Sequence, residues 1–129
     1  MSDALSLIQT LYGHFGRGDV PALLEMLTPD VVWEFQGDRG APYTAKVVGP
    51  SQVGEWFTEV GKADDIQRFD PERFLAGPDH VTVIGSERTI ARSSGRTFEC
   101  SWVHVFEVRD GRVARFWGLL DSEAAAAAR

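Results

Sequence analysis

Apolar residues recur along this chain with two different periods. Over residues 3–17 they recur every three or four positions, which predicts an amphipathic helix with one apolar stripe. Asp19 and the proline that follows it at position 21 predict the start of a second, short helix that ends near Leu27. Residues 49–51 predict the start of a third helix, in which four large apolar side chains share one face: Val53, Trp56, Phe57 and Val60.

Alternation with a period of two, which is typical of strands, dominates the second half of the chain. Pro71 interrupts one such run, over residues 66–76, and this predicts an edge or bulged strand because proline has no N–H to donate to a neighbouring strand. The other strands are predicted at residues 31–35, at residues 80–91, and on both sides of a tight turn (109–111) within residues 97–121.

Two segments are predicted to lack regular structure. Residues 36–46 are predicted to form a loop because they contain two glycines and a proline, which interrupt regular structure. Residues 122–129 contain five consecutive alanines and show no apolar face to bury, so we expect a short C-terminal tail. The order is therefore three helices with one strand among them, followed by a meander of strands. This order predicts an α+β fold in which a curled sheet leaves a pocket between its concave face and the helices.

Composition and charge argue against several classes of protein. A chain of 129 residues is predicted to form a single domain, 1–129. Its 13 basic and 19 acidic residues give a net charge of −6, which argues against nucleic acid as a partner. No apolar run is long enough to span a membrane, and no signal pattern is visible, so we expect a cytoplasmic protein without a membrane partner.

Metal and disulfide chemistry find little support in the sequence. A single cysteine, Cys100, cannot form an internal disulfide, and its place in an apolar row indicates a buried, inert thiol. No two histidines have the spacing of a helical zinc motif. We therefore expect no metal site and no cofactor.

One histidine stands in an aromatic row. Phe98, Cys100, Trp102, His104 and Phe106 alternate along one strand and therefore share a face. An ordinary imidazole titrates near pH 6.5, so His104 in a pocket would suit proton transfer at neutral pH. The alternative is a core histidine that is hydrogen-bonded to a neighbour.

The strand alternation and the stripe of the third helix predict an apolar cavity on the concave face of the sheet. Arg88, if it shares the face of His104, is a candidate to orient a ligand, whereas Glu87 and Glu99 are expected to be exposed. Gly118 is expected to leave room for a ligand, since it has no side chain. The predicted ligand-binding residues are Trp33, Phe35, Tyr43, Trp56, Phe57, Trp102, Phe106, Phe116 and Gly118.

Several runs of residues resemble a known superfamily. LYGHFGRGD at 11–19, LLEMLTPDVVW at 23–33 and VFEVRDGRV at 105–113 are similar to elements of NTF2-like proteins, in particular the SnoaL-like branch related to ketosteroid isomerases. The resemblance implies a cone of three N-terminal helices packed on a strongly curved, mostly antiparallel sheet, and a homodimer formed through the convex face of that sheet. It implies no single function, because this fold hosts isomerases, cyclases, hydrolases, dehydratases and non-catalytic binders.

The catalytic positions of ketosteroid isomerases are only partly matched. Phe35 stands where they carry an aspartate base, while Glu34 should point to the opposite face. His104 stands where they carry a protonated aspartate that donates a hydrogen bond, and a histidine can also donate there. Their first-helix tyrosine comes nearest to Leu11 or Tyr12.

Two other groups of relatives are matched less well. Arg88 corresponds to an arginine of limonene epoxide hydrolases, but Ile90 and Gly118 stand where those enzymes carry aspartates. Gly118 also stands where SnoaL cyclases carry a catalytic aspartate. Asp121 is three residues away and would point to the opposite face of a regular strand.

Two hypotheses about function remain open. In the first, the protein binds a small apolar or aromatic molecule and performs cofactor-independent acid–base chemistry of the isomerase, cyclase or lyase type. His104 would donate or accept the proton, Tyr12 or Tyr43 would assist, and Arg88 would orient the ligand. In the second, the protein is a non-catalytic ligand-binding or dimerisation module.

Overall fold

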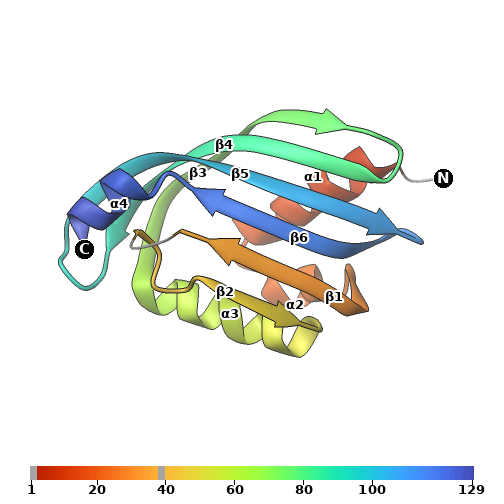
Figure 1. Ribbon diagram of the computed structural model, residues 1–129, viewed down its shortest axis with the longest axis horizontal. Coiled ribbons are helices and arrows are strands. Elements are labelled where there is room, and N and C mark those ends of the chain that lie inside the picture. The colour runs from red at the N-terminus through yellow and green to blue at the C-terminus, as the bar shows by residue number, and fades with distance from the viewer. Residues whose placement is uncertain (1–2, 38–39) are drawn as a thin grey trace.

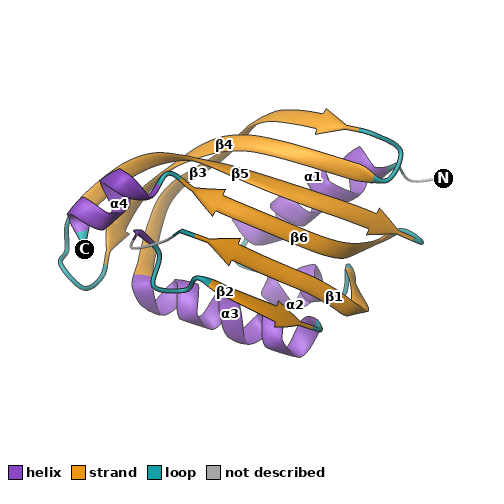
Figure 2. Ribbon diagram, in the orientation of Figure 1, coloured by secondary structure: helices purple, strands orange, loops and turns teal. Residues whose placement is uncertain are grey.

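A computed structural model describes residues 3–37 and 40–129 as an α+β fold (Figure 1). Helices α1, α2 and α3 cover one face of a curved six-stranded sheet (Figure 2). The sequence predicts this packing of helices on a sheet, but with five strands. The elements in chain order are α1 (Ala4–Gly16), α2 (Val20–Leu24), β1 (Leu27–Gln36), β2 (Ala45–Val48), α3 (Pro50–Ala63), β3 (Asp64–Ala76), β4 (His80–Ala91), β5 (Thr97–Arg109), β6 (Arg112–Leu120) and α4 (Ser122–Ala128).

The sheet has the strand order β2-β1-β6-β5-β4-β3. Strands β3 to β6 form an antiparallel meander, and β1 joins it by pairing in parallel with β6. Trp33 therefore lies opposite Phe116, and Phe35 lies opposite Gly118. The parallel pair brings two aromatic strands side by side at the middle of the sheet.

Polar side chains cap the first two helices. The carboxylate of Asp3 accepts a hydrogen bond from the backbone N–H of Ser6 at 2.7 Å, and Asp19 accepts one from Ala22 at 3.2 Å. The apolar stripes of the three helices face the sheet, and their buried residues include Ile8, Leu23 and Val53. None of the helices in the described part of the chain is long and apolar enough to span a membrane.

Strand β3 lies at the edge of the sheet, and its pairing with β4 shifts register next to Pro71. The prediction of an edge or bulged strand is therefore confirmed. A second register shift follows Ile66. An edge strand tolerates proline because one of its sides has no neighbouring strand. The N–H that proline lacks can fall on that side, where no hydrogen bond is lost.

Two predicted boundaries are wrong. The second helix ends at Leu24 rather than near Leu27, because Leu27 already begins the first strand, which is longer than expected. The predicted loop at residues 36–46 contains the start of β2, whose residues pair antiparallel with β1 from Val48 to Ala45. A four-residue edge strand carries too few residues to show a clear alternation.

The expectation that residues 122–129 have no face to bury is also wrong. Residues 122–128 form α4, and the side chain of Asp121 caps it by accepting a hydrogen bond from the backbone N–H of Glu123 at 3.3 Å. Ala125 and Ala128 are buried. Alanine is the best helix former, and its small side chain lets a helix pack closely, but a uniform alanine run shows no apolar periodicity to detect.

Candidate ligand cavity

A cavity lies between the concave face of the sheet and helices α1 and α3. The cavity volume is about 60 Å³, room for a few water molecules and well below the 300–1,000 Å³ of typical small-molecule sites. A ring compound would therefore have to displace aromatic side chains that now fill the interior. All eight aromatic residues predicted to bind a ligand lie on its wall: Trp33, Phe35, Tyr43, Trp56, Phe57, Trp102, Phe106 and Phe116.

The aromatic side chains of the wall stack on one another. The rings of Trp33 and Phe116 are 4.0 Å apart, and the ring of Trp102 lies 4.1 Å from His104 and 4.6 Å from Phe69. Stacked rings of this kind contribute about 0.5–1.5 kcal/mol per pair beyond their burial. The wall is therefore a closely packed, mostly apolar surface with few polar atoms.

His104 and Tyr12 form a hydrogen bond at this wall. The Tyr12 hydroxyl lies 2.7 Å from Nδ1 of His104, which is almost completely buried. Burial lowers the pKa of His104 to about 3, so the imidazole is neutral at neutral pH. Burial also raises the pKa of the Tyr12 hydroxyl, which therefore keeps its proton.

The direction of this hydrogen bond determines what His104 can do. Within residues 3–37 and 40–129 the Tyr12 hydroxyl has no acceptor besides Nδ1, so it donates there. A neutral imidazole that accepts at Nδ1 carries its hydrogen on Nε2. Nε2 makes no hydrogen bond to the described residues. His104 therefore offers an N–H donor to a ligand.

Two further donors on the wall lack partners. The indole N–H groups of Trp33 and Trp102 are buried and make no hydrogen bond within the described part of the chain. A buried donor without an acceptor costs about 1–3 kcal/mol. Neither nitrogen is accessible from the cavity, so a ligand could reach them only after the neighbouring rings had moved.

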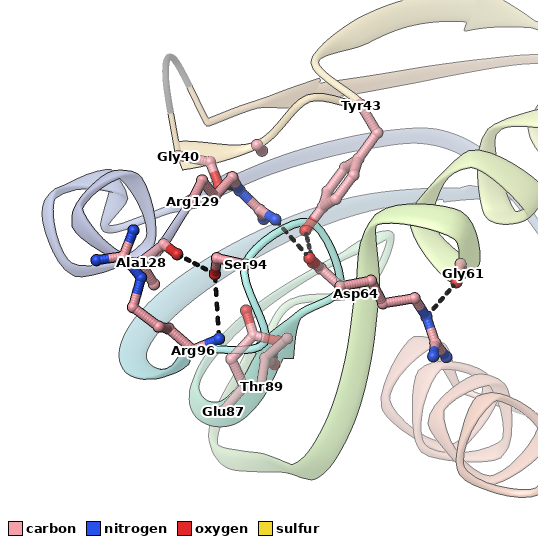
Figure 3. A network of polar contacts seen from close by, with 12 residues as sticks. Gly40, Tyr43, Gly61, Asp64, Glu87, Thr89, Ser94, Arg96, Ala128 and Arg129 are labelled. Atoms are coloured by element: carbon pink, nitrogen blue, oxygen red, sulfur yellow. Dashed lines mark hydrogen bonds and ion pairs between the residues drawn. The ribbon is translucent and has the colours of Figure 1, made fainter.

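A second polar cluster lies at the end of the sheet near α4 (Figure 3). The hydroxyl of Tyr43 donates to Oδ2 of Asp64 at 2.5 Å, and Nη1 of Arg129 donates to Oδ1 of Asp64 at 2.8 Å. Arg129 also donates from Nε to the Gly40 carbonyl at 2.7 Å. The Tyr43 hydroxyl, one of the two predicted to assist catalysis, is thus engaged with Asp64.

Glu87 is the residue that sequence reasoning missed. It was expected to be exposed, but only 4% of it is accessible, and it lies on the cavity wall. Thr89 Oγ1 donates to Oε2 of Glu87 at 3.0 Å, and the Cys100 thiol donates to Oε1 at 3.6 Å. Burial raises the pKa of this carboxyl, and the nearby charge of Asp64 raises it further.

The signal for Glu87 was present in β4. Val81, Val83 and Gly85 precede it at alternate positions, all of them buried. Arg88, the next residue, consequently points to the convex face, where its side chain is 52% exposed and lies 3.9 Å from Glu99. Arg88 therefore does not share the face of His104. Glu99 is exposed as expected.

The space beside Gly118 is filled by rings. A Cβ atom at this position would lie 2.6 Å from Phe116 and 2.8 Å from Phe35. Gly118 thus makes room for two aromatic side chains and is not on the cavity wall, contrary to the expectation that it leaves space for a ligand.

The thiol of Cys100 is buried, and burial raises its pKa to about 12, so it stays protonated.

The fold is that of NTF2-like proteins. An NTF2-like protein from Burkholderia thailandensis is 22% identical with a TM-score of 0.91, over 99% of this chain and 98% of that one. TerC, co-crystallised with polyporic acid, is 24% identical with a TM-score of 0.84, over 96% and 95% of the two chains. A candidate polyketide cyclase from Xanthomonas campestris pv. campestris is 18% identical with a TM-score of 0.81, over 97% and 95%.

Within this fold class the chain belongs to the SnoaL-like domain family, whose model matches residues 8–116. The resemblance seen in the sequence is therefore confirmed. None of the curated proteins compared with the chain matches it.

Proposed function

We propose that this protein binds a small aromatic molecule with an oxygen acceptor and catalyses a proton transfer on it without a cofactor. The observation that carries the proposal is the Tyr12–His104 hydrogen bond at the wall of an aromatic cavity. The hydrogen on Nε2 of His104 favours a ligand with an acceptor oxygen. The co-crystallisation of TerC, a protein of this fold, with polyporic acid supports a small-molecule ligand.

In this proposal His104 stabilises negative charge that develops on the ligand. Its Nε2–H donates to the ligand oxygen, and Tyr12 fixes the tautomer by donating to Nδ1. The lowered pKa, about 3, keeps the imidazole neutral, so the donor needs no counter-ion in the apolar interior. Donors held in place where charge develops are among the largest contributions to catalysis.

The first test uses 2-tetralone, a bicyclic aromatic ketone. Binding is measured by quenching of tryptophan fluorescence, and proton transfer by NMR as exchange of the ring-adjacent CH₂ protons in D₂O. We expect His104→Ala to slow exchange roughly 100-fold, the usual cost of removing one such donor. His80→Ala is the control, because His80 is exposed and outside the cavity. Equal exchange rates in H104A and wild type would show that His104 has no such role.

A non-catalytic binding module is the second candidate function. It is favoured by Phe35 and Gly118, which stand where relatives carry carboxylates and whose surroundings are filled by rings. This alternative predicts that 2-tetralone quenches the fluorescence of the wild type without any accelerated exchange. The same experiment therefore separates the two functions.

We also propose a homodimer formed through the convex face of the sheet. Val103 lies between Ile84 and Leu119 on neighbouring strands, and Val105 lies opposite Trp117. These side chains point away from the cavity and are only partly buried, so they form an apolar patch on the outer face. Apolar patches of this kind mark interaction surfaces.

Sedimentation tests the dimer. We expect the wild type at micromolar concentration to sediment as twice the 14.3 kDa chain, and Val103→Glu to sediment as the single chain because it places a charge in the patch. Gln9→Glu is the control, since Gln9 is exposed on helix α1, which covers the opposite face of the sheet. A wild type that sediments only at 14.3 kDa contradicts the proposal.

A further inference from the structure

We propose that an aromatic ligand enters this cavity by displacing the side chain of Phe69, and that its ring then stacks on Trp102 in place of the phenyl ring. The inference rests on the proposed function and names the entrance and the ring subsite of the same site. A cavity of about 60 Å³ is too small for an aromatic ring, since benzene needs an engineered cavity of about 150 Å³ in another protein. A side chain of the wall must therefore move before such a ligand binds.

One part of the wall reaches the surface. Most residues of the wall are buried, and the partly exposed ones come from α1, α3 and β3. Phe15 connects these elements, because its ring lies 6.0 Å from that of Phe57 on α3 and 5.0 Å from that of Phe69 on β3. The partly exposed residues of the wall are Tyr12, Phe15, Phe57, Ile66 and Phe69. The entrance to the cavity therefore lies where the two helices meet the edge strand.

Phe69 lies on the part of this entrance whose backbone is held least firmly. Strand β3 is an edge strand, and its pairing with β4 shifts register on both sides of residues 68–71. The residues that flank this segment, Gln67 and Glu72, have no partner on β4. Register shifts of this kind disrupt the hydrogen-bond ladder. The other rings at the entrance are carried by helices, whose backbone hydrogen bonds are formed within the helix.

The ring of Phe69 shows where a ligand ring fits. It lies 4.6 Å from the ring of Trp102 at an interplanar angle of 11°, which is a stacked arrangement, and 6.1 Å from the ring of His104. A ligand ring in the same place regains the stacking that the displaced phenyl ring loses. A saturated ring does not, because it has no π face. The subsite therefore selects flat aromatic molecules.

Gly85 allows the indole of Trp102 to reach β3. Gly85 lies opposite Trp102 on β5 and opposite Pro71 on β3. A Cβ atom on Gly85 would lie 2.3 Å from the indole, so the ring crosses β4 only because this residue is glycine. The indole packs on the backbone of β4, which holds it in place when Phe69 moves away.

A ligand ring in this subsite brings its oxygen to His104. One carbonyl substituent and a hydrogen bond of about 3 Å together cover the 6.1 Å between the centres of the two rings. His104 then donates from Nε2, as in the proposed function. The ligand class that fits is a flat aromatic molecule whose carbonyl group lies on the ring or one atom away from it.

The test is Phe69→Ala, which removes the ring that fills the subsite. Stopped-flow quenching of tryptophan fluorescence by 2-tetralone measures the association rate and the dissociation constant. We expect F69A to bind the ketone about 10-fold more tightly, and correspondingly faster, because a site that is open in only a minor fraction of molecules loses affinity by that fraction. Phe74→Ala is the matched control: it makes the same substitution on the same strand and also removes a contact with the Tyr12 ring, but Phe74 is not on the cavity wall. It should leave both quantities unchanged.

The ring subsite has a readout of its own. 2-Decalone is the saturated counterpart of 2-tetralone and carries the same carbonyl group. F69A should bind it about 2- to 10-fold more weakly than 2-tetralone, which is what one stacked pair contributes. In a crystal of F69A soaked with 2-tetralone, the ligand ring should lie on Trp102. Equal affinity for the two ketones, or a ligand ring that lies elsewhere, overturns the assignment of the subsite.

The outcomes separate this inference from the proposed function. If F69A and wild type bind the ketone with the same rate and affinity, Phe69 does not close the entrance and the inference is wrong, while proton exchange by wild type still supports the proposed function. If F69A binds the ketone on Trp102 but neither protein exchanges its protons, the proposed catalysis is wrong and the subsite stands. Failure of both proteins to bind the ketone overturns both. Should F69A fail to fold, Phe69→Leu removes the flat ring but keeps an apolar side chain, and association at the wild-type rate there overturns the inference.

Discussion

Replacing Arg129 with methionine is expected to lower the free energy of unfolding by about 3–5 kcal/mol, the usual cost of removing one partner of a buried ion pair. The side chain of Asp64 is completely buried, and that of Arg129 is 13% exposed. Methionine keeps the length of the side chain but leaves the Asp64 carboxylate without its cation. Urea denaturation measures the effect.

A surface pair provides the matched control. Arg109 lies 2.7 Å from Asp30, about as close as Arg129 lies to Asp64, but both side chains of this surface pair are more than half exposed. Arg109→Met should cost much less than Arg129→Met, because water screens an exposed pair. Adding Asp64→Asn to Arg129→Met should restore part of the lost stability, since the unpaired charge is then gone. Equal losses in the two arginine variants would contradict the argument.

Acid should destabilise the protein through His104, over the pH range below about 6.5. Burial lowers the folded-state pKa to about 3, so between pH 6.5 and 3 the unfolded state binds a proton that the folded state does not. Stability therefore falls as the pH falls through this range, by up to about 1.4 kcal/mol per pH unit. The measurement is the free energy of unfolding in urea at a series of pH values.

Glu87 contributes to the same curve with the opposite sign. Its raised pKa means that the folded state keeps a proton that the unfolded state loses above about pH 4.5, so its contribution to stability declines as the pH rises.

The difference between wild type and His104→Phe isolates the contribution of the histidine: the variant should lose the part of the pH slope that is due to His104. His80→Asn, which changes an exposed histidine, should keep the wild-type curve. A wild-type curve parallel to that of H104F would show that His104 is not buried in the neutral form.

The fold and the aromatic wall could be predicted because both depend on local periodicity. The alternation around Trp102 and His104 fixes which side chains point inward once one face of the sheet is buried. Glutamate is seldom buried, so residue type alone gives the wrong expectation for Glu87. The alternation of β4 should have outweighed residue type there.

Contacts between segments that are far apart in the chain could not be predicted from the sequence. Tyr12 and His104 are 92 positions apart, and Asp64 and Arg129 are 65 apart. Such pairs depend on how whole elements dock, which no window of periodicity contains. The alanine run of α4 has no apolar periodicity, so the sequence did not indicate that this helix would place Arg129 beside the buried carboxylate of Asp64.

The parallel pairing of β1 with β6 sets an order for folding. Strands β3 to β6 are joined by short turns and can pair locally, whereas Trp33 meets Phe116 only after a long loop has closed. We therefore expect the four-stranded meander to form the nucleus, and β1, β2 and the first three helices to dock on its β6 edge afterwards. The cavity is enclosed by that last step, so its aromatic wall is assembled late and exposed until then.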